Sequence, residues 1–209
     1  MDDGKAAAQA PGNVAQLRVL YPEPGERARR KQLDRLDVHC RRFIELSPFV
    51  VVSSSGADGA LDASPRGGDP GFVQVEDERT LLLPDAPGNN RLDTLQNVIA
   101  TGRIGLLFLV PGVDESLRVN GRAQLSVDPR DLARCALPRR QPKVVIRIAV
   151  EDAYLHCAKA LMRSELWNPA KHVPRESLPT MGRMIGDQTG LQIAPETQEE
   201  MVRRYAEDL

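Results

Sequence analysis

The sequence predicts a mainly β fold, a small antiparallel barrel with peripheral helices. Several short apolar runs are separated by clusters of glycine, proline, asparagine and aspartate, as is typical of strands joined by tight turns. Residues 117–127 alternate apolar and polar side chains, which indicates a strand with one buried face. Residues 103–110 are almost continuously apolar, which predicts a central strand buried on both faces. Many short strands with a few peripheral helices are typical of a small antiparallel barrel with helical additions.

In the first half of the chain, a helix precedes two strand pairs. Residues 27–46 carry apolar side chains at helical spacing, which predicts one amphipathic helix. Residues 49–53 and 60–64 flank a Ser-Ser-Gly-Ala-Asp-Gly turn and should form a hairpin. Residues 65–71 are rich in glycine and proline and predict a stiff loop that carries Arg66. A second strand pair is expected at residues 72–76 and 80–83.

The second half alternates helices and strands and ends in short helical pieces. A helix is predicted from residue 91 to about residue 101, ahead of the central strand. Asp128 and Pro129 begin a short helix by the N-cap and first-turn proline pattern. A last strand is expected at residues 143–154 and helical turns at 156–164, followed by proline-punctuated helical pieces, the last from about residue 196 to residue 207.

Charge and composition limit the kinds of partner. Lys plus Arg total 28 and Asp plus Glu total 29, so no overall positive field attracts nucleic acid or an anionic membrane. No apolar run approaches the roughly 20 residues that a membrane helix needs. The cysteines, Cys40, Cys135 and Cys157, lie far apart without a Cys-x-x-Cys pair, which favours a reducing compartment. We therefore expect a cytoplasmic protein with no membrane or nucleic-acid partner.

The domain organisation follows from the same composition. Residues 1–16 are rich in alanine, glycine and glutamine but lack the apolar core of a secretory signal, and we predict a disordered tail there. Residues 17–209 are expected to form a single domain with N-terminal helices and a C-terminal helical extension.

Residues 84–97 are the strongest candidate for a functional site. An apolar strand ends at Pro84, and the chain restarts as a helix for which Asn90 is the expected N-cap and Asp93 the capping-box acid. A helix start offers unpaired N–H groups, and Arg91 beside it adds donors suited to phosphate. Arg66, in the preceding glycine-rich loop, is a second candidate cation. The alternative is a capped loop with a solvated arginine.

Four motifs in order resemble the pyridoxamine 5'-phosphate oxidase-related proteins. The motifs are Asp-Ala-Ser-Pro-Arg-Gly at residues 62–67, Gly-Asn-Asn-Arg at 88–91, Leu-Arg-Val-Asn-Gly-Arg-Ala at 117–123, and His-Cys-Ala-Lys-Ala at 156–160 with Arg163 and Trp167. The likeness spans roughly residues 17–185. It implies the FMN-binding split β-barrel, an antiparallel Greek-key-like fold, and a homodimer with FMN in grooves between the protomers.

The resemblance also implies which residues bind the cofactor. Ser64, Pro65 and Arg66 correspond to the strand beside the flavin ring and ribityl chain, and Asn89, Asn90 and Arg91 to the phosphate loop. Leu92 stands where the oxidase proper has a lysine, and Arg66 is the candidate replacement for that charge. Lys159, Arg163 and Trp167 are expected to reach the flavin of the other protomer.

Several of these residues have simpler alternative roles. Lys159 and Arg163 could be a solvated helix face, and Trp167 a core or interface residue. Arg118, Asn120 and Arg122 form a polar strand face that either is wet or lines the groove, and Arg118 or Arg163 could lie near the flavin N1 and O2 atoms. The His-Cys pairs at residues 39–40 and 156–157 lack metal-ligand spacing, so no metal is expected.

The expected function is that of an FMN-dependent oxidoreductase acting on a small molecule. No catalytic acid or base is assigned, and no Arg-x-His element follows the last strand, so vitamin B6 phosphate oxidation is not supported. The alternatives are a non-catalytic flavin- or haem-binding module, or a plain dimeric barrel without cofactor.

Overall fold

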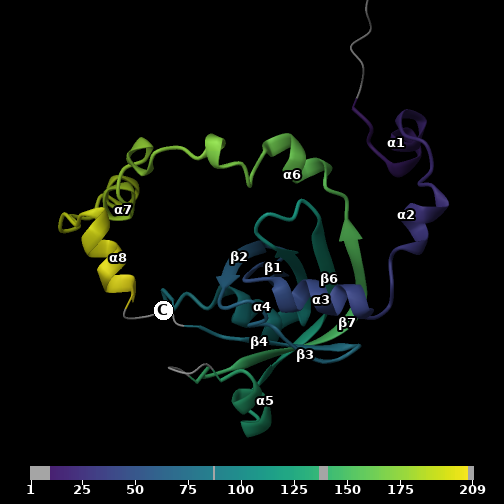
Figure 1. The fold of residues 1–209 in the computed structure, drawn as a ribbon, viewed down its shortest axis with the longest axis horizontal. Coiled ribbons are helices and arrows are strands. Elements are labelled where there is room, and N and C mark those ends of the chain that lie inside the picture. The colour runs from purple at the N-terminus through teal and green to yellow at the C-terminus, as the bar shows by residue number, and fades with distance from the viewer. Residues whose placement is uncertain (1–9, 87, 137–140, 207–209) are drawn as a thin grey trace, which may run out of the picture.

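Seven strands form one antiparallel sheet in the order β2-β1-β5-β6-β7-β4-β3. The computed structural model describes residues 10–86, 88–136 and 141–206 (Figure 1). The strands are β1 (Phe49–Ser55), β2 (Leu61–Gly67), β3 (Gln74–Asp77), β4 (Thr80–Pro84), β5 (Arg103–Leu109), β6 (Ser116–Ser126) and β7 (Val145–His156). β1 pairs with β2, and β3 pairs with β4, both antiparallel. The hairpin predicted for residues 49–64 and the strand pair predicted for residues 72–83 are therefore confirmed.

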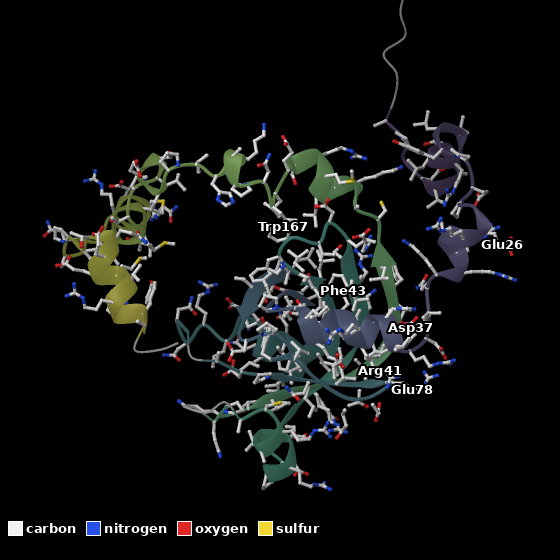
Figure 2. The ribbon with its side chains drawn as sticks, in the orientation of Figure 1. Glu26, Asp37, Arg41, Phe43, Glu78 and Trp167 are labelled. Atoms are coloured by element: carbon white, nitrogen blue, oxygen red, sulfur yellow. The ribbon has the colours of Figure 1, made fainter. Side chains whose placement is uncertain are left out.

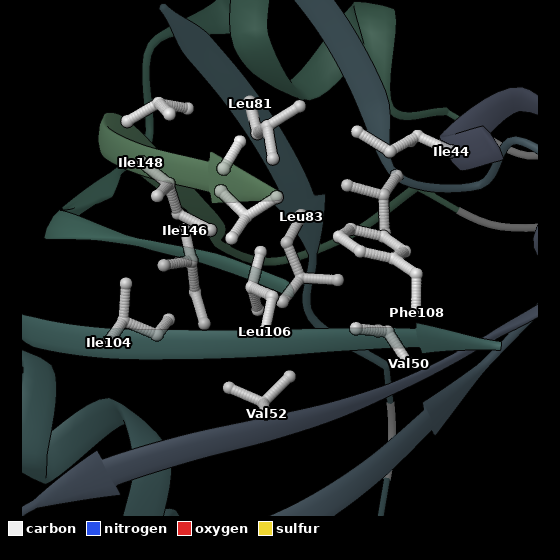
Figure 3. Close-up of a cluster of buried hydrophobic side chains, with 14 of the residues drawn as sticks. Ile44, Val50, Val52, Leu81, Leu83, Ile104, Leu106, Phe108, Ile146 and Ile148 are labelled. Atoms are coloured by element: carbon white, nitrogen blue, oxygen red, sulfur yellow. The ribbon is translucent and has the colours of Figure 1, made fainter. Parts of the chain in front are cut away.

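The sheet curls around a single main core. Val50 of β1, Leu83 of β4 and Ile148 of β7 belong to one buried cluster, although β1 and β4 are not neighbours in the sheet (Figure 3). The edge strands β2 and β3 do not pair with each other, so the barrel stays split. This mainly β split barrel with peripheral helices confirms the predicted fold class.

Two central strands differ in how they are buried. The inward side chains of β6 are buried as its alternation predicts, including Leu117 and Val119. β5 was expected to be buried on both faces, and this is wrong. Its buried side chains alternate with half-buried ones such as Leu107, because Leu107 lies opposite the exposed Arg118 of β6, on the face of the sheet that is open to solvent there. Within the described residues, β6 rather than β5 is the middle strand.

The helices lie around the barrel. They are α1 (Val14–Leu20), α2 (Glu26–Arg30), α3 (Val38–Leu46), α4 (Asp93–Thr101), α5 (Pro129–Arg134), α6 (Lys159–Ser164), α7 (Met181–Thr189) and α8 (Gln198–Ala206), with 3-10 turns at Pro169–Lys171 and Arg175–Ser177. α3 packs on β3, β6 and β7, and α4 packs on β1, β2, β5 and β6. α7 and α8 lie at the end of an arm that begins after β7 and arches around the sheet (Figure 1). Among the described residues, no helix has the length and apolar character to cross a bilayer.

The single helix predicted over residues 27–46 is wrong. Residues between α2 and α3 are drawn into long-range backbone pairing: Leu33 exchanges hydrogen bonds of 3.0 and 2.8 Å with Ala153, and the Leu36 N–H donates to the Glu78 carbonyl at 2.7 Å. Asp37 then caps α3 by accepting from the Cys40 N–H at 2.8 Å. Leu36 is only 1% exposed. The apolar spacing therefore predicted the burial of Leu36 correctly, but it predicted a helix where the backbone is not helical.

The N-terminal boundary falls inside a helix. α1 begins at Val14, so the predicted end of the tail at residue 16 lies within its first turn. Residues 1–9 lie outside the described part of the chain. The division into tail and domain stays a prediction.

Candidate functional site

The edge strand β2 presents the first group of predicted site residues. Its side chains alternate, with Asp62, Ser64 and Arg66 half-buried and Ala63 and Pro65 exposed on the other face. Residues 65–67 were predicted as loop, which is wrong, because β2 continues to Gly67. An edge strand tolerates proline because only one side of its backbone is paired. Ser64 and Arg66 thus share a face, and Pro65 lies on the opposite one.

A hydrogen-bond network joins this face of β2 to the first turn of α4. Asp62 accepts hydrogen bonds from the Ser64 hydroxyl at 2.8 Å and from the Thr94 hydroxyl at 2.6 Å. The Arg66 Nη2 atom in turn donates to Thr94 Oγ1 at 3.2 Å. Thr94 is 1% exposed. The Arg66 guanidinium is therefore held at the beginning of α4.

The loop before α4 begins the helix two residues later than predicted. Asn89 Oδ1 accepts from the Arg91 N–H at 3.1 Å, while Asn90 and Leu92 adopt left-handed φ values of 58° and 61°. The helix therefore starts at Asp93, and Asn90 is not its N-cap. The local turn made by Asn89 and the tolerance of asparagine for this conformation explain the shift. The capping-box role predicted for Asp93 is wrong for the same reason.

Arg91 lies at the surface beside this helix start. Its Nε atom donates to Asp93 Oδ2 at 2.8 Å, and its side chain is 71% exposed. Among the described residues, no bond is made by its two terminal nitrogens, so both are open to a ligand. The pKa of the Arg91 guanidinium is raised by its hydrogen bond to Asp93.

Carboxylates near Arg66 and Arg91 give the site a mixed charge. Burial raises the pKa of Asp62, but the hydrogen bonds from Thr94, Ser64 and Ser54 outweigh burial and leave the pKa below its ordinary value. At Asp85, just after β4, burial dominates and raises the pKa, while nearby Arg66 opposes the rise. An anion bound here would compete with acids for the two arginines.

The second predicted group is not joined to the first within the chain. Lys159 and Arg163 are exposed on α6. The Trp167 indole donates to the Val113 carbonyl at 3.0 Å, and this bond ties the arm to the turn between β5 and β6 (Figure 2). No hydrogen bond or ion pair within the described ranges links these three residues to Arg66 or Arg91.

The cysteines and histidines offer no alternative centre within the described residues. Cys40 and Cys135 are buried, and burial raises the pKa of each thiol to about 11, so both stay protonated at neutral pH. No group of three or more His, Cys, Asp or Glu side chains in residues 10–86, 88–136 and 141–206 has the arrangement of a metal site.

Asp62 and Thr94 were missed by the sequence reasoning. Asp62 lies two residues before Ser64, so strand periodicity would have placed both on one face. Thr94 carries no sequence signal of its own, because its partners lie 32 and 28 residues away in the chain.

Replacing Asp62 with asparagine should destabilise the protein by about 1–3 kcal/mol at pH 7, since an amide cannot accept both hydroxyl bonds as a carboxylate does. The folded pKa of Asp62 lies below its ordinary value of 3.8, so its contribution is present above that pH and lost as pH falls through the folded pKa. Urea unfolding of both proteins at neutral and at acid pH measures the difference, which should shrink on acidification. Asp69→Asn, at an exposed loop position, is the control. A pH-independent difference would contradict the network.

Comparison with known proteins gives one sequence match that spans most of the barrel. The family described as pyridoxamine 5'-phosphate oxidase matches residues 36–157, more than half of the 209 residues. No curated protein matches the chain.

Several solved structures are similar at low identity. HupZ from Group A Streptococcus is 17% identical, over 56% of this chain and 91% of that chain, with a TM-score of 0.48. A Clostridium acetobutylicum protein related to general stress protein 26, of the pyridoxinephosphate oxidase family, is 11% identical over 57% and 86%, with a TM-score of 0.45. A FAD-binding protein from Mycobacterium smegmatis is 16% identical over 59% and 97%, with a TM-score of 0.43. Because these identities and TM-scores are low, the family assignment rests on the sequence match over residues 36–157 alone.

Proposed function

Because the chain belongs to the pyridoxamine 5'-phosphate oxidase family, we propose that it binds FMN and acts as a flavin-dependent oxidoreductase on a small molecule. The observation that carries the proposal is the convergence of Arg66 and Arg91 on the beginning of α4. Arg66 is held there by Thr94, and Arg91 leaves its terminal nitrogens open.

The donor set fits the two ends of FMN. A phosphate dianion favours arginine forks and the N–H groups at a helix start. A flat ring with a polar edge favours a strand edge. Among the residues that the structure describes, β2 pairs only with β1, so alternate backbone groups of β2 face away from β1. The backbone of Ser64 and Pro65 would lie along the ring and ribityl chain, and Asn89 and Asn90 would shape the phosphate loop. The bound flavin would supply hydride or electron transfer, while the chain supplies binding and orientation.

A homodimer completes this proposal. Lys159, Arg163 and Trp167 lie on the arm and, within the described residues, make no bond to Arg66 or Arg91 of their own chain. In a two-fold dimer the same residues of the partner could reach the flavin. The edge of each FMN site would then be built from both protomers, with FMN between them.

The visible spectrum of the purified protein tests the proposal. We expect flavin absorption after purification or after addition of FMN and gel filtration, with about one FMN per chain, as grooves between two protomers imply. Bleaching of the flavin by NADH or NADPH under anaerobic conditions would support catalysis over storage. A haem spectrum would favour the haem-binding module. A colourless protein that retains no added FMN would contradict the proposal.

A further inference from the structure

A cluster of cationic and aromatic side chains lies on the outer face of the sheet, away from Arg66 and Arg91. The β6–β7 register places Arg118 opposite Tyr154 and Ser116 opposite His156. Since side chains two residues apart on a strand share a face, Tyr154 and His156 project from β7 on the side of Arg118. Their rings lie 5.0 Å apart between centroids.

The segment after α2 brings a second cation to the same ring. The paired backbones of Leu33 and Ala153 hold this segment beside β7. Lys31 therefore reaches across the strand, donates to the Leu155 carbonyl at 2.8 Å and lies 5.2 Å from the centroid of the Tyr154 ring. A residue 124 positions away in sequence thus completes the cluster.

The two cations have no acidic partner within the described part of the chain. Arg118 donates to the Tyr154 hydroxyl at 2.8 Å, and its Cζ atom lies 5.7 Å from the ring centroid. By contrast Arg122, on the same strand, pairs with Glu151 at 3.2 Å. Two like charges beside one ring repel each other, and an anion between them would remove that repulsion. Most of the donors of Lys31 and Arg118 remain open for it.

The neighbouring histidine is suited to the same ligand. Burial lowers the pKa of His156, and Arg118 and Lys31 lower it further, so the imidazole is neutral at pH 7 and adds a donor without a third charge. Asp152, two residues before Tyr154 on β7, accepts from the Asn120 amide at 3.0 and 3.3 Å.

We propose that Lys31, Arg118, Tyr154 and His156 form a binding site for the oxyanion of a small molecule, a carboxylate or a phosphate. The site stands on these contacts and does not depend on flavin binding. Its two cations match one small anion, whereas the near-neutral chain, with a net charge of −1, offers no extended field for a polyanion.

Histidine NMR on the full chain tests this site directly, because the sequence has only 3 histidines and the other two, His39 and His172, serve as internal references. The protein is labelled on the imidazole ring and titrated with sodium phosphate, sodium succinate or sodium chloride at matched ionic strength. We expect a saturable shift of the His156 resonances with phosphate or succinate and a rise in its pKa, while the references stay in place. Which of the two anions binds identifies the chemical source.

Variants separate a built site from general screening. Arg118→Gln and Lys31→Gln should each weaken the effect at His156 at least about tenfold, since each removes a charge-assisted contact. Arg122→Gln on the same strand should leave it unchanged. An equal response to chloride, or full binding by Arg118→Gln, would overturn the proposal. The titration is run with and without FMN, so failure of flavin binding and failure of this site are distinguishable.

Discussion

Replacing Arg66 with alanine is expected to weaken FMN binding by about tenfold to about a hundredfold while riboflavin binding changes little. A charge-assisted contact contributes about 1.5–3 kcal/mol, and riboflavin lacks the phosphate that makes it. Arg91→Ala should act in the same direction but less strongly, because Arg91 is 71% exposed and shares its guanidinium with Asp93. Fluorescence titration of both flavins with both variants measures the effect.

The matched control is Arg103→Ala. Arg103 follows α4 in sequence, at the far end of the helix from the site, and pairs with Glu151 at 3.3 Å, so its loss should alter neither flavin. If FMN and riboflavin lose affinity equally in the Arg66 and Arg91 variants, these arginines do not hold the phosphate, even if flavin is bound.

Replacing Gly121 with alanine should cost stability at the upper end of the range for overpacking, about 3 kcal/mol or more. A Cβ atom at this position would lie 2.1 Å from the Ala149 carbonyl oxygen and 3.0 Å from its carbon. The obstacle is the backbone of β7 in the middle of the sheet, at the register shift between Asn120 and Gly121, so no side-chain rotation relieves it. Urea unfolding should show a lower midpoint.

Gly88→Ala is the control for that experiment. A Cβ atom at Gly88 meets nothing within 4 Å, so its free energy of unfolding should stay within about 0.5 kcal/mol of the parent protein. A Gly121 variant as stable as the Gly88 variant would show that β6 and β7 separate more easily than their packing implies.

The sequence was most informative where burial and backbone follow the same local pattern. The alternation along β6 predicted its inward face, because successive side chains of a strand point to opposite faces of the sheet. The spacing of Leu33 and Leu36 misled because their backbone groups pair with Ala153 and Glu78, far away in the chain. The residues adjacent to Leu33 and Leu36 in the sequence do not indicate these distant pairing partners.

The candidate site was predictable in its charges but not in its geometry. Arg66 and Arg91 were identified as cations beside turns, yet Arg66 proved to lie in a strand and the cap at Asn90 proved absent. The turn at Asn89 and the left-handed residues after it decide the helix start, and the Asp62–Thr94 contact decides where Arg66 sits. These features depend on folded neighbours rather than on residue type.

The exposed edge of β2 also has a consequence for aggregation of the protein. A free strand edge is a template onto which another chain can add, and sheets of this kind grow into aggregates when nothing interrupts the row of backbone donors. Pro65 lacks an N–H and interrupts that row near its middle, with half-buried Arg66 adding a charge beside it. β2, the strand proposed to lie along the flavin, therefore also carries the residues that oppose the addition of further strands and so oppose aggregation.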